Sequence, residues 1–297
     1  MAGFFGLFNY DKEGPGISKN GPKKKTFIVF FETFFRNFWK FMPINLVYIL
    51  LNIPLVTNGF ANVGLTNVAR NTARDKHSFG LSDFFDTIKK NFKQSLISGI
   101  INTIVYAFLF FDIWFFYNNE GKFATLGLGV IFAILLLFSI MNFFLWTLII
   151  TFDFTLKQAY LNSFKFVFIN LKNNLLCIFV NILVFALNIA IIFLVQKYWF
   201  FALLVELILF ILLYPGFNAL LIQYCTFPSI KKFIIDPYYK EHPEADIDKR
   251  RSLGLEIETK KKSENSEIET EEMQEDSDVI FEDWFFKLLT HIIPYNN

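Results

Sequence analysis

Apolar and polar residues follow a repeated pattern along this chain. Short stretches carry large aromatic side chains on one helical face and polar or basic side chains on the other, and each leads into a long apolar run. Leu81 to Tyr117 shows this best, because Phe84, Ile88 and Phe92 recur at helical spacing before the apolar run 97–117. The pattern predicts an amphipathic helix among the lipid headgroups that feeds a membrane span. An amphipathic hairpin helix in water is the alternative for its first half.

Further apolar runs are candidate spans, at residues 42–57, 123–152, 175–195 and 198–222. Two more amphipathic stretches, 27–41 and 153–174, precede the first and the fourth of the five runs. Proline and glycine at Tyr214-Pro215-Gly216 predict a kink in the last run. The fold class predicted is therefore an all-α, polytopic α-helical membrane protein with about five transmembrane helices and interfacial amphipathic helices before the spans.

An internal repeat is visible when the sequence is compared with itself at a shift of 79 residues. The shift aligns Asn91 with Asn170, Lys93 with Lys172, and Asn102 with Asn181. Each copy runs from an amphipathic helix through a basic-polar elbow into a span that carries one asparagine. Arg36-Asn37-Phe38, before the first run, is a weaker third copy. Such duplication is common in transporters, whose sites lie between the repeats, and also in proteins that transport nothing.

Orientation follows from the basic residues between the spans. Segments 58–96 and 153–174 are rich in Lys and Arg, whereas the turns at 118–122 and 196–197 carry one Lys each. The positive-inside rule places the two basic segments in the cytoplasm. The basic amino-terminal segment then leaves two topologies for residues 42–71. Either the chain crosses five times, which we favour from sequence, or these residues dip into the membrane and return, with both ends cytoplasmic.

Charge divides the chain into three predicted parts. Residues 1–26 form a basic tail without a signal-peptide pattern, and 27–235 form the helical membrane domain. Before residue 236 the chain has twenty Lys/Arg against ten Asp/Glu, and from there on it has eight against seventeen. The acidic part 236–297 is expected to be cytoplasmic and largely disordered, with a short amphipathic helix at 278–293.

Two carboxylates lie within predicted spans, where charges are costly and often functional. Asp112 and Glu206, with Asn102 and Asn181, are candidates for an intramembrane polar site that takes a cation, a proton or a polar solute. The alternative is that each carboxylate reaches the interface or pairs with Lys122 or Lys197. For the asparagines, hydrogen bonding between helices is the structural alternative to a substrate pathway.

Basic side chains beside the spans are candidates for contacts to lipid headgroups or a partner protein. They are Arg70, Arg74, Lys89, Lys90, Lys93 and Lys172. Because they stand next to apolar runs, we expect lipid phosphate rather than nucleic acid.

Catalytic and cofactor motifs are missing from the sequence. It has no phosphate-binding glycine loop, nucleophile elbow, HExxH or paired-carboxylate arrangement. His77, His242 and His291 have no metal-ligand spacing, and two cysteines cannot make a disulfide framework. The sequence therefore predicts neither an enzyme nor a cofactor, and it does not indicate an oligomeric state.

Several blocks of the sequence resemble the YesL-like family of uncharacterised integral membrane proteins of Gram-positive bacteria. They include residues 14–19 (GPGISK), 36–40 (RNFWK), 45–48 (NLVY), 68–71 (VARN), 89–95 (KKNFKQS) and 228–239 (PSIKKFIIDPYY). Where the family has Gly-Pro-Ala after the first span, this chain has Gly59-Phe60-Ala61, which puts the rigidity of that elbow in question. The resemblance implies a plasma-membrane location and a role beside sugar-uptake systems.

Two functions are therefore considered. The first is a non-enzymatic accessory or regulatory partner of a membrane system such as carbohydrate uptake, with a transporter subunit as its partner. The second is a small-solute transporter or permease subunit that uses a polar site between the repeats.

Overall fold

The computed structural model describes residues 26–76, 78–194 and 199–241, and every secondary-structure element within these ranges is helical. This confirms the all-α prediction. Most of the predicted basic tail and the predicted acidic tail beyond Glu241, including its helix at 278–293, lie outside the described residues.

The helices follow one order three times: a short helix, an elbow, and a two-helix hairpin. The first unit is α1 (Thr26–Arg36), α2 (Phe38–Asn52), the 3-10 turn η2 (Leu55–Thr57) and α3 (Asn58–Ala73). The second is α4 (Leu81–Lys90), α5 (Phe92–Tyr117) and α6 (Lys122–Thr151). The third is α7 (Leu156–Ile169), α8 (Leu171–Leu194) and α9 (Trp199–Ile230), followed by the π-helical turn η4 (Lys231–Ile235) and α10 (Asp236–Glu241).

Four helical stretches among the described residues are long and apolar enough to cross a membrane. They are Phe92–Tyr117, Lys122–Thr151, Leu171–Ile191 and Leu203–Lys240. The chain is thus a polytopic α-helical membrane protein with one candidate span fewer than predicted. The missing one is 42–57, because α2 has 15 residues and a helix of that length extends only about 22 Å, less than the hydrocarbon core.

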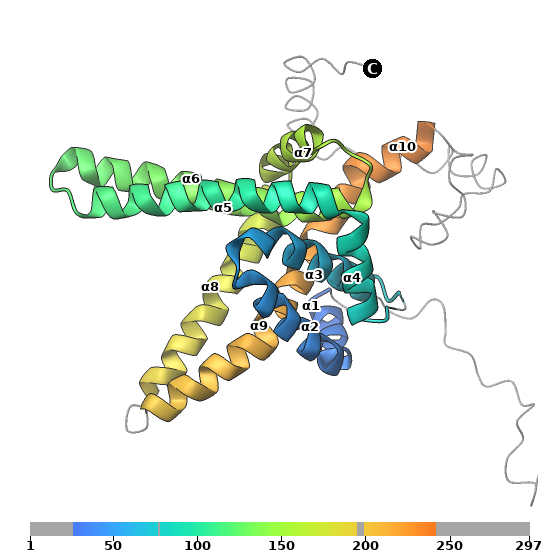
Figure 1. The fold of residues 1–297 in the computed structure, drawn as a ribbon, viewed down its shortest axis with the longest axis horizontal. Coiled ribbons are helices and arrows are strands. Elements are labelled where there is room, and N and C mark those ends of the chain that lie inside the picture. Colours follow the sequence, from blue (N-terminus) through green and yellow to red (C-terminus); the bar gives the residue numbers. More distant parts are fainter. Residues whose placement is uncertain (1–25, 77, 195–198, 242–297) are drawn as a thin grey trace, which may run out of the picture.

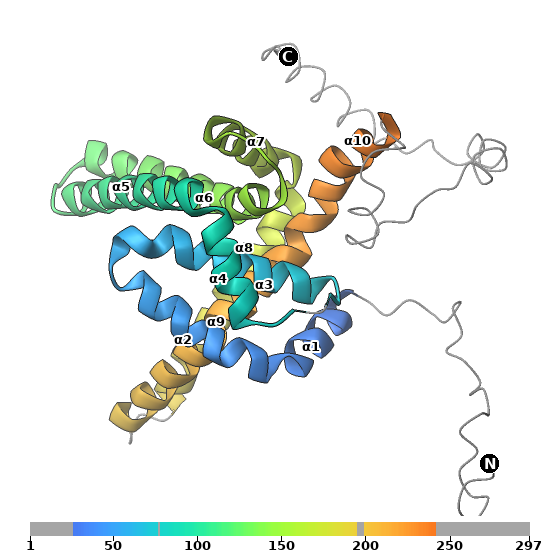
Figure 2. The same ribbon diagram turned by 45° about the vertical axis from the view of Figure 1, so that its right-hand side comes forward.

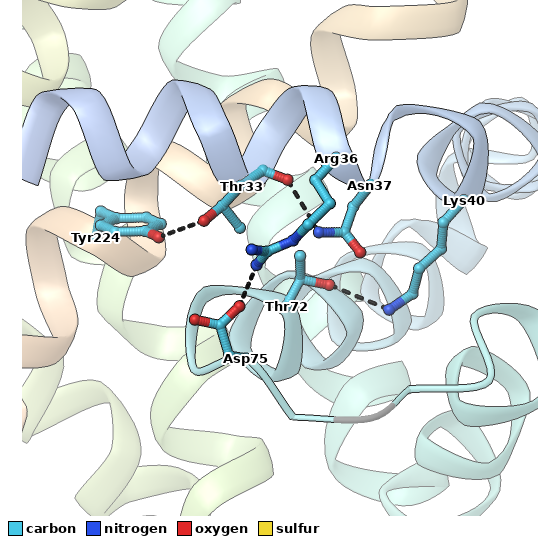
Figure 3. A network of polar contacts seen from close by, with 7 residues as sticks. All are labelled: Thr33, Arg36, Asn37, Lys40, Thr72, Asp75 and Tyr224. Atoms are coloured by element: carbon cyan, nitrogen blue, oxygen red, sulfur yellow. Dashed lines mark hydrogen bonds and ion pairs between the residues drawn. The ribbon is translucent and has the colours of Figure 1, made fainter. Parts of the chain in front are cut away.

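The two ends of the α2–α3 hairpin lie together. Arg36 at the end of α1 forms an ion pair with Asp75, just after α3. Lys40 in the first turn of α2 donates a hydrogen bond from Nζ to Thr72 Oγ1 at 3.3 Å. Figure 3 shows both contacts tying the start of this hairpin to its end.

The tip of this hairpin reaches only the middle of α5. Thr103, near the midpoint of α5, donates a hydrogen bond to the carbonyl oxygen of Leu55 in η2 at 3.2 Å. Both ends together and a tip at mid-depth are the geometry of the re-entrant alternative. The described residues give four candidate spans rather than the five of the topology favoured from sequence.

The polar helix α3 lies at the centre of the molecule, where protein covers it. It packs against α2, α4, α5, α6 and α9. Nine of its residues are buried, among them Asn67 and Thr72. Phe84 of α4, completely buried, packs so closely on Gly64 that a Cβ there would lie 2.7 Å from its ring. A helix too polar for lipid is tolerated at this position because protein surrounds it.

Two glycines hold the turn from η2 into α3 close to α5. A Cβ on Gly59 would lie 1.8 Å from the carbonyl oxygen of Ser95, and one on Gly99 would lie 2.6 Å from the backbone nitrogen of Gly59. Phe60 stacks on Phe92 with ring centroids 4.9 Å apart. This part of the chain is therefore held by close backbone contact and ring stacking.

The two long hairpins diverge. Figures 1 and 2 show α5–α6 and α8–α9 leaving the region of α3 in different directions, with the α2–α3 hairpin between them. Their apolar windows are only 11 to 22% buried. The remaining apolar surface of these arms is what a lipid-facing span requires.

Candidate functional site

Each unit turns from its short helix into its hairpin at an asparagine with nearly the same backbone conformation. The φ and ψ angles are −104° and 12° at Asn37, −110° and 23° at Asn91, and −105° and 30° at Asn170. Asn37 and Asn91 donate side-chain hydrogen bonds to the carbonyl oxygens of Thr33 and Thr87, four residues earlier. The three elbows give the predicted repeat a structural counterpart, including its weak third copy.

The third elbow is buried and more highly bonded. Asn170 donates from Nδ2 to the carbonyl oxygen of Cys225 at 3.0 Å, and its Oδ1 accepts hydrogen bonds from Asn173 and from Ser229 Oγ at 2.6 Å. It is only 5% exposed. This asparagine therefore joins the α7–α8 elbow to the far end of α9.

Eleven residues after each elbow asparagine, a polar side chain bonds to the other helix of its hairpin. In the first unit, Tyr48 donates to Asn62 Oδ1 at 3.2 Å. In the second, Asn102 donates to Asn142 Oδ1 at 2.5 Å. In the third, the corresponding residue Asn181 accepts a hydrogen bond from the Tyr214 hydroxyl at 2.8 Å. The predicted residues Asn102 and Asn181 thus bond between helices within their own hairpins.

A cavity of about 260 Å³ lies where the three hairpins meet. All three units contribute side chains to its wall: Tyr48, Ile49, Asn62, Leu65, Thr66, Asn142, Phe143, Trp146, Phe210, Tyr214, Pro215, Asn218, Ala219, Ile222 and Gln223. The wall includes one or both members of each interhelical pair. It contains no Asp, Glu, Lys, Arg or His.

Two residues that line the cavity carry amide oxygens that accept no hydrogen bond and are enclosed by protein, so these oxygens do not face the cavity. They are Asn218 Oδ1 and Gln223 Oε1. Gln223 is only 2% exposed, and its amide nitrogen donates to Thr147 Oγ1 at 2.8 Å. A buried polar atom without a partner is costly to the stability of the fold.

The two candidate arginines are partly buried, and both contact other helices. Arg70 donates to the carbonyl oxygen of Ile150 at 3.1 Å, to Thr151 Oγ1 at 2.8 Å and to Asn67 Oδ1 at 2.7 Å. It thereby caps the negative end of α6. Arg74 stacks over the Phe227 ring, with 3.7 Å from its guanidinium carbon to the ring centroid.

Burial shifts the titration of both arginines. It lowers the pKa of Arg70 to about 10, and burial together with the positive charge of Arg70 lowers the pKa of Arg74 to about 9. Arg70 Nε and two nitrogens of Arg74 are buried without a hydrogen-bond partner. The two side chains connect α3 to the ends of α6 and α9.

The candidate lysines are exposed, and three of them gather at the second elbow. Lys89, Lys90 and Lys93 line a surface pocket of about 440 Å³ at the α4–α5 elbow, beside Asp153 after the end of α6. Lys172 is exposed at the third elbow, two residues after its asparagine, as Lys93 is at the second. These positions suit contact with an anionic headgroup or with an acidic partner surface.

Asp112 and Glu206 lie on different hairpins. Asp112 belongs to the outer half of α5 and Glu206 to the outer half of α9, and these hairpins diverge (Figure 1). Among the described residues, no hydrogen bond or ion pair involves either carboxylate. A single chain therefore does not bring the two together. Lys197, a predicted partner, lies outside the described residues.

The cavity wall includes residues that sequence reasoning did not single out as a site. Tyr48, Tyr214 and Gln223 were missed, although the spacing of eleven residues from an elbow asparagine was a signal for Tyr48. In the part of the chain that the structure describes, no group of three His, Cys, Asp or Glu is placed to hold a metal.

Comparison with known proteins gives one family match. The family described as "Protein of unknown function, DUF624" matches residues 41–113, about a quarter of the chain. The matched segment covers α2 from its fourth residue, α3, α4 and most of α5. No curated protein and no solved structure matches this chain.

Proposed function

We propose that this chain is a non-enzymatic accessory or regulatory protein of a membrane transport system such as carbohydrate uptake, and that it docks its partner through the elbow end of the three units. The observation that carries this proposal is the lysine-lined pocket at the α4–α5 elbow. The family match at residues 41–113 includes this elbow. The blocks at 14–19 and 228–239, outside the match, support extending it to the YesL-like family.

The distribution of charge supports a cytoplasmic elbow end. Of the basic residues that the structure describes, Lys122 alone stands at a hairpin tip, and the rest lie toward the elbows. By the positive-inside rule the elbows face the cytoplasm. In this proposal the protein resides in the plasma membrane, and the α2–α3 hairpin returns to the side from which it enters. The chain then crosses the membrane four times, so both of its ends lie in the cytoplasm. The conflict raised by a basic amino-terminal segment then disappears.

Internal hydrogen bonding supports a structural rather than a catalytic interior. Two asparagines of the long hairpins bond between helices: Asn102 with Asn142, and Asn181 with Tyr214. Interhelical bonds of this kind stabilise packing in lipid. The charged side chains available to a partner are concentrated at the elbows.

Co-purification tests the docking proposal. The full-length protein is cross-linked in its native membrane, purified, and its partners are identified by mass spectrometry. We expect a transporter subunit to be recovered with the wild type and with Lys122→Glu, and to fall at least tenfold with Lys89→Glu/Lys90→Glu/Lys93→Glu. If the protein is recovered alone and moves solute in liposomes, the accessory role is wrong.

A second candidate function is transport of a small solute, and one observation favours it. The cavity lies between the repeated hairpins, which is where repeat-built transporters hold their substrates. Transport by the purified protein in liposomes would distinguish this candidate from the accessory role.

A further inference from the structure

We propose that an acidic segment of this chain, residues 264–283, occupies the lysine-lined pocket at the α4–α5 elbow. The contact is inferred from the charge of the pocket, the exposure of its lysines and the position at which the described chain ends. Its consequence, competition with the partner for the same lysines, rests on the docking function proposed above. The chain thereby controls access to its own docking surface.

The pocket offers positive charge to a ligand. Lys89, Lys90 and Lys93 are exposed in its wall, and the one acid in that wall is Asp153. Lys89 Nζ lies 3.7 Å from Asp86 Oδ1, one turn earlier in α4. Among the residues that the structure describes, neither Lys90 nor Lys93 has an ion pair. Charge complementarity therefore favours a ligand that carries several anionic groups.

The acidic segment has the charge that this pocket lacks. Its 20 residues contain ten Asp or Glu and no Lys or Arg, as many carboxylates as residues 1–235 together. The segment lies outside the described residues and is identified by its sequence. One exposed ion pair contributes little to binding, but the repeated carboxylates offer a partner to each lysine of the pocket.

The position at which the described chain ends also favours this occupant. Tyr239 of α10 and Phe152 of the pocket wall pack against the same buried cluster, which includes Ile235. Figures 1 and 2 show α10 and the α4–α5 elbow on the side of the molecule away from both long hairpin tips. The segment begins 23 residues after Glu241, a length that spans up to about 80 Å. Tethering over such a length gives an effective concentration of about a millimolar.

Lysine reactivity tests the contact. The full chain is placed in nanodiscs of phosphatidylcholine, which carry no anionic lipid, and is acetylated with an amine-reactive ester. Mass spectrometry gives the rate at each lysine. The same measurement is made on an amide variant of the segment, which carries Glu264→Gln, Glu267→Gln, Glu269→Gln, Glu271→Gln, Glu272→Gln, Glu275→Gln, Asp276→Asn, Asp278→Asn, Glu282→Gln and Asp283→Asn.

We expect Lys90 and Lys93 to react about threefold faster in the amide variant, because the wild-type segment covers them about two thirds of the time. Lys122, exposed at the tip of the α5–α6 hairpin, should react at the same rate in both proteins. Elution as a single monodisperse species shows that each variant is folded.

A matched control removes carboxylates of the same tail outside the segment. The variant Glu244→Gln/Asp246→Asn/Asp248→Asn should leave the rates at Lys90 and Lys93 as in the wild type. A carbodiimide, which joins a lysine amine to a carboxylate in contact with it, should link the pocket lysines of the wild type to residues 264–283. In a mixture of isotopically labelled and unlabelled protein, these links should join peptides of the same label.

Three outcomes would overturn the proposal. The first is an equal rate at Lys90 and Lys93 in the wild type and the amide variant. The second is protection that requires added phosphatidylglycerol, which would assign the pocket to a lipid headgroup. The third is carbodiimide links only between labelled and unlabelled chains, which would make the occupant a second copy.

The contact and the docking function fail separately. Because the segment leaves about a third of the pockets free, the amide variant should raise recovery of the transporter subunit about threefold. Protected lysines with no recovered subunit would support the contact and reject the docking. Loss of the subunit in Lys89→Glu/Lys90→Glu/Lys93→Glu, with no protection in the wild type, would reject the contact alone.

Discussion

Asparagine serves two purposes in this protein, and both depend on its position relative to an elbow. At each elbow the asparagine lies between two helices, and its φ and ψ angles are nearly the same in all three units. Three turns later, Asn102 and Asn181 bond across their hairpins. The repeat at a shift of 79 residues, which aligns Asn102 with Asn181, identifies both residues as candidates from the sequence. Their partners Asn142 and Tyr214 were not assigned from sequence, because each is more than thirty positions away and is selected by packing.

Replacing Asn170 by Ala should destabilise the protein more than replacing an exposed asparagine. The change leaves the Cys225 carbonyl and the Ser229 hydroxyl buried without their partner, at a cost of about 2–3 kcal/mol. Thermal unfolding in mild detergent measures this as a fall of several degrees in Tm. The control Asn119→Ala removes an exposed side chain that bonds to Phe115 and should change Tm by a degree or two at most. Equal shifts would contradict a structural role for the third elbow.

Arg70 should tolerate Lys poorly and Met worse. Its guanidinium bonds to three acceptors at once, including the end of α6, and a lysine ammonium cannot reproduce that fork. We expect Arg70→Met to lower the free energy of unfolding by about 2–4 kcal/mol, and Arg70→Lys to lower it by a smaller amount. The control Lys157→Met, at an exposed position, should leave the free energy of unfolding almost unchanged. The measurement is Tm together with the yield of monodisperse protein. A stable Arg70→Met variant would show that the cap on α6 is dispensable.

The α2–α3 hairpin is the element that sequence reasoning resolved least. Residues 42–57 are apolar enough to suggest a span, and periodicity cannot tell a crossing from a return. The distinction depends on contacts between distant segments: Arg36 with Asp75, and Thr103 with Leu55. The long spans were predicted well because twenty or more apolar residues in one run have few other structures to form.

Gly59→Ala should disrupt the start of α3, where this helix packs against α5. A methyl group there would lie 1.8 Å from the carbonyl oxygen of Ser95, and backbone on both sides prevents relaxation. We expect a loss of about 2–3 kcal/mol or a failure to fold, read as reduced yield and lower Tm. Gly129→Ala is the matched control, because nothing lies within 4 Å of its added Cβ. If both variants behave alike, the close contact of α3 with α5 is not a determinant of the fold.

At the scale of the whole molecule, three units share one plan but differ in depth. The second and third extend into full spans, whereas the first folds back halfway and places a polar helix where the other two hairpins cover it. The cavity follows from this arrangement, since it forms only where all three hairpins meet. Sequence comparison could suggest the repeat, but the meeting point of its copies depends on packing between helices distant in sequence.

The re-entrant first hairpin, with four crossings, is the central claim, and cysteine accessibility tests it most directly. Single cysteines are introduced as Thr26→Cys, Asn119→Cys and Lys240→Cys in a chain whose buried Cys177 and Cys225 are replaced by Ala. An impermeant maleimide is applied to intact cells and, in parallel, to permeabilised cells. The account predicts that Asn119→Cys reacts in intact cells, while Thr26→Cys and Lys240→Cys react only after permeabilisation. Labelling of Thr26→Cys from outside intact cells, with Lys240→Cys protected, would mean five crossings and would contradict it.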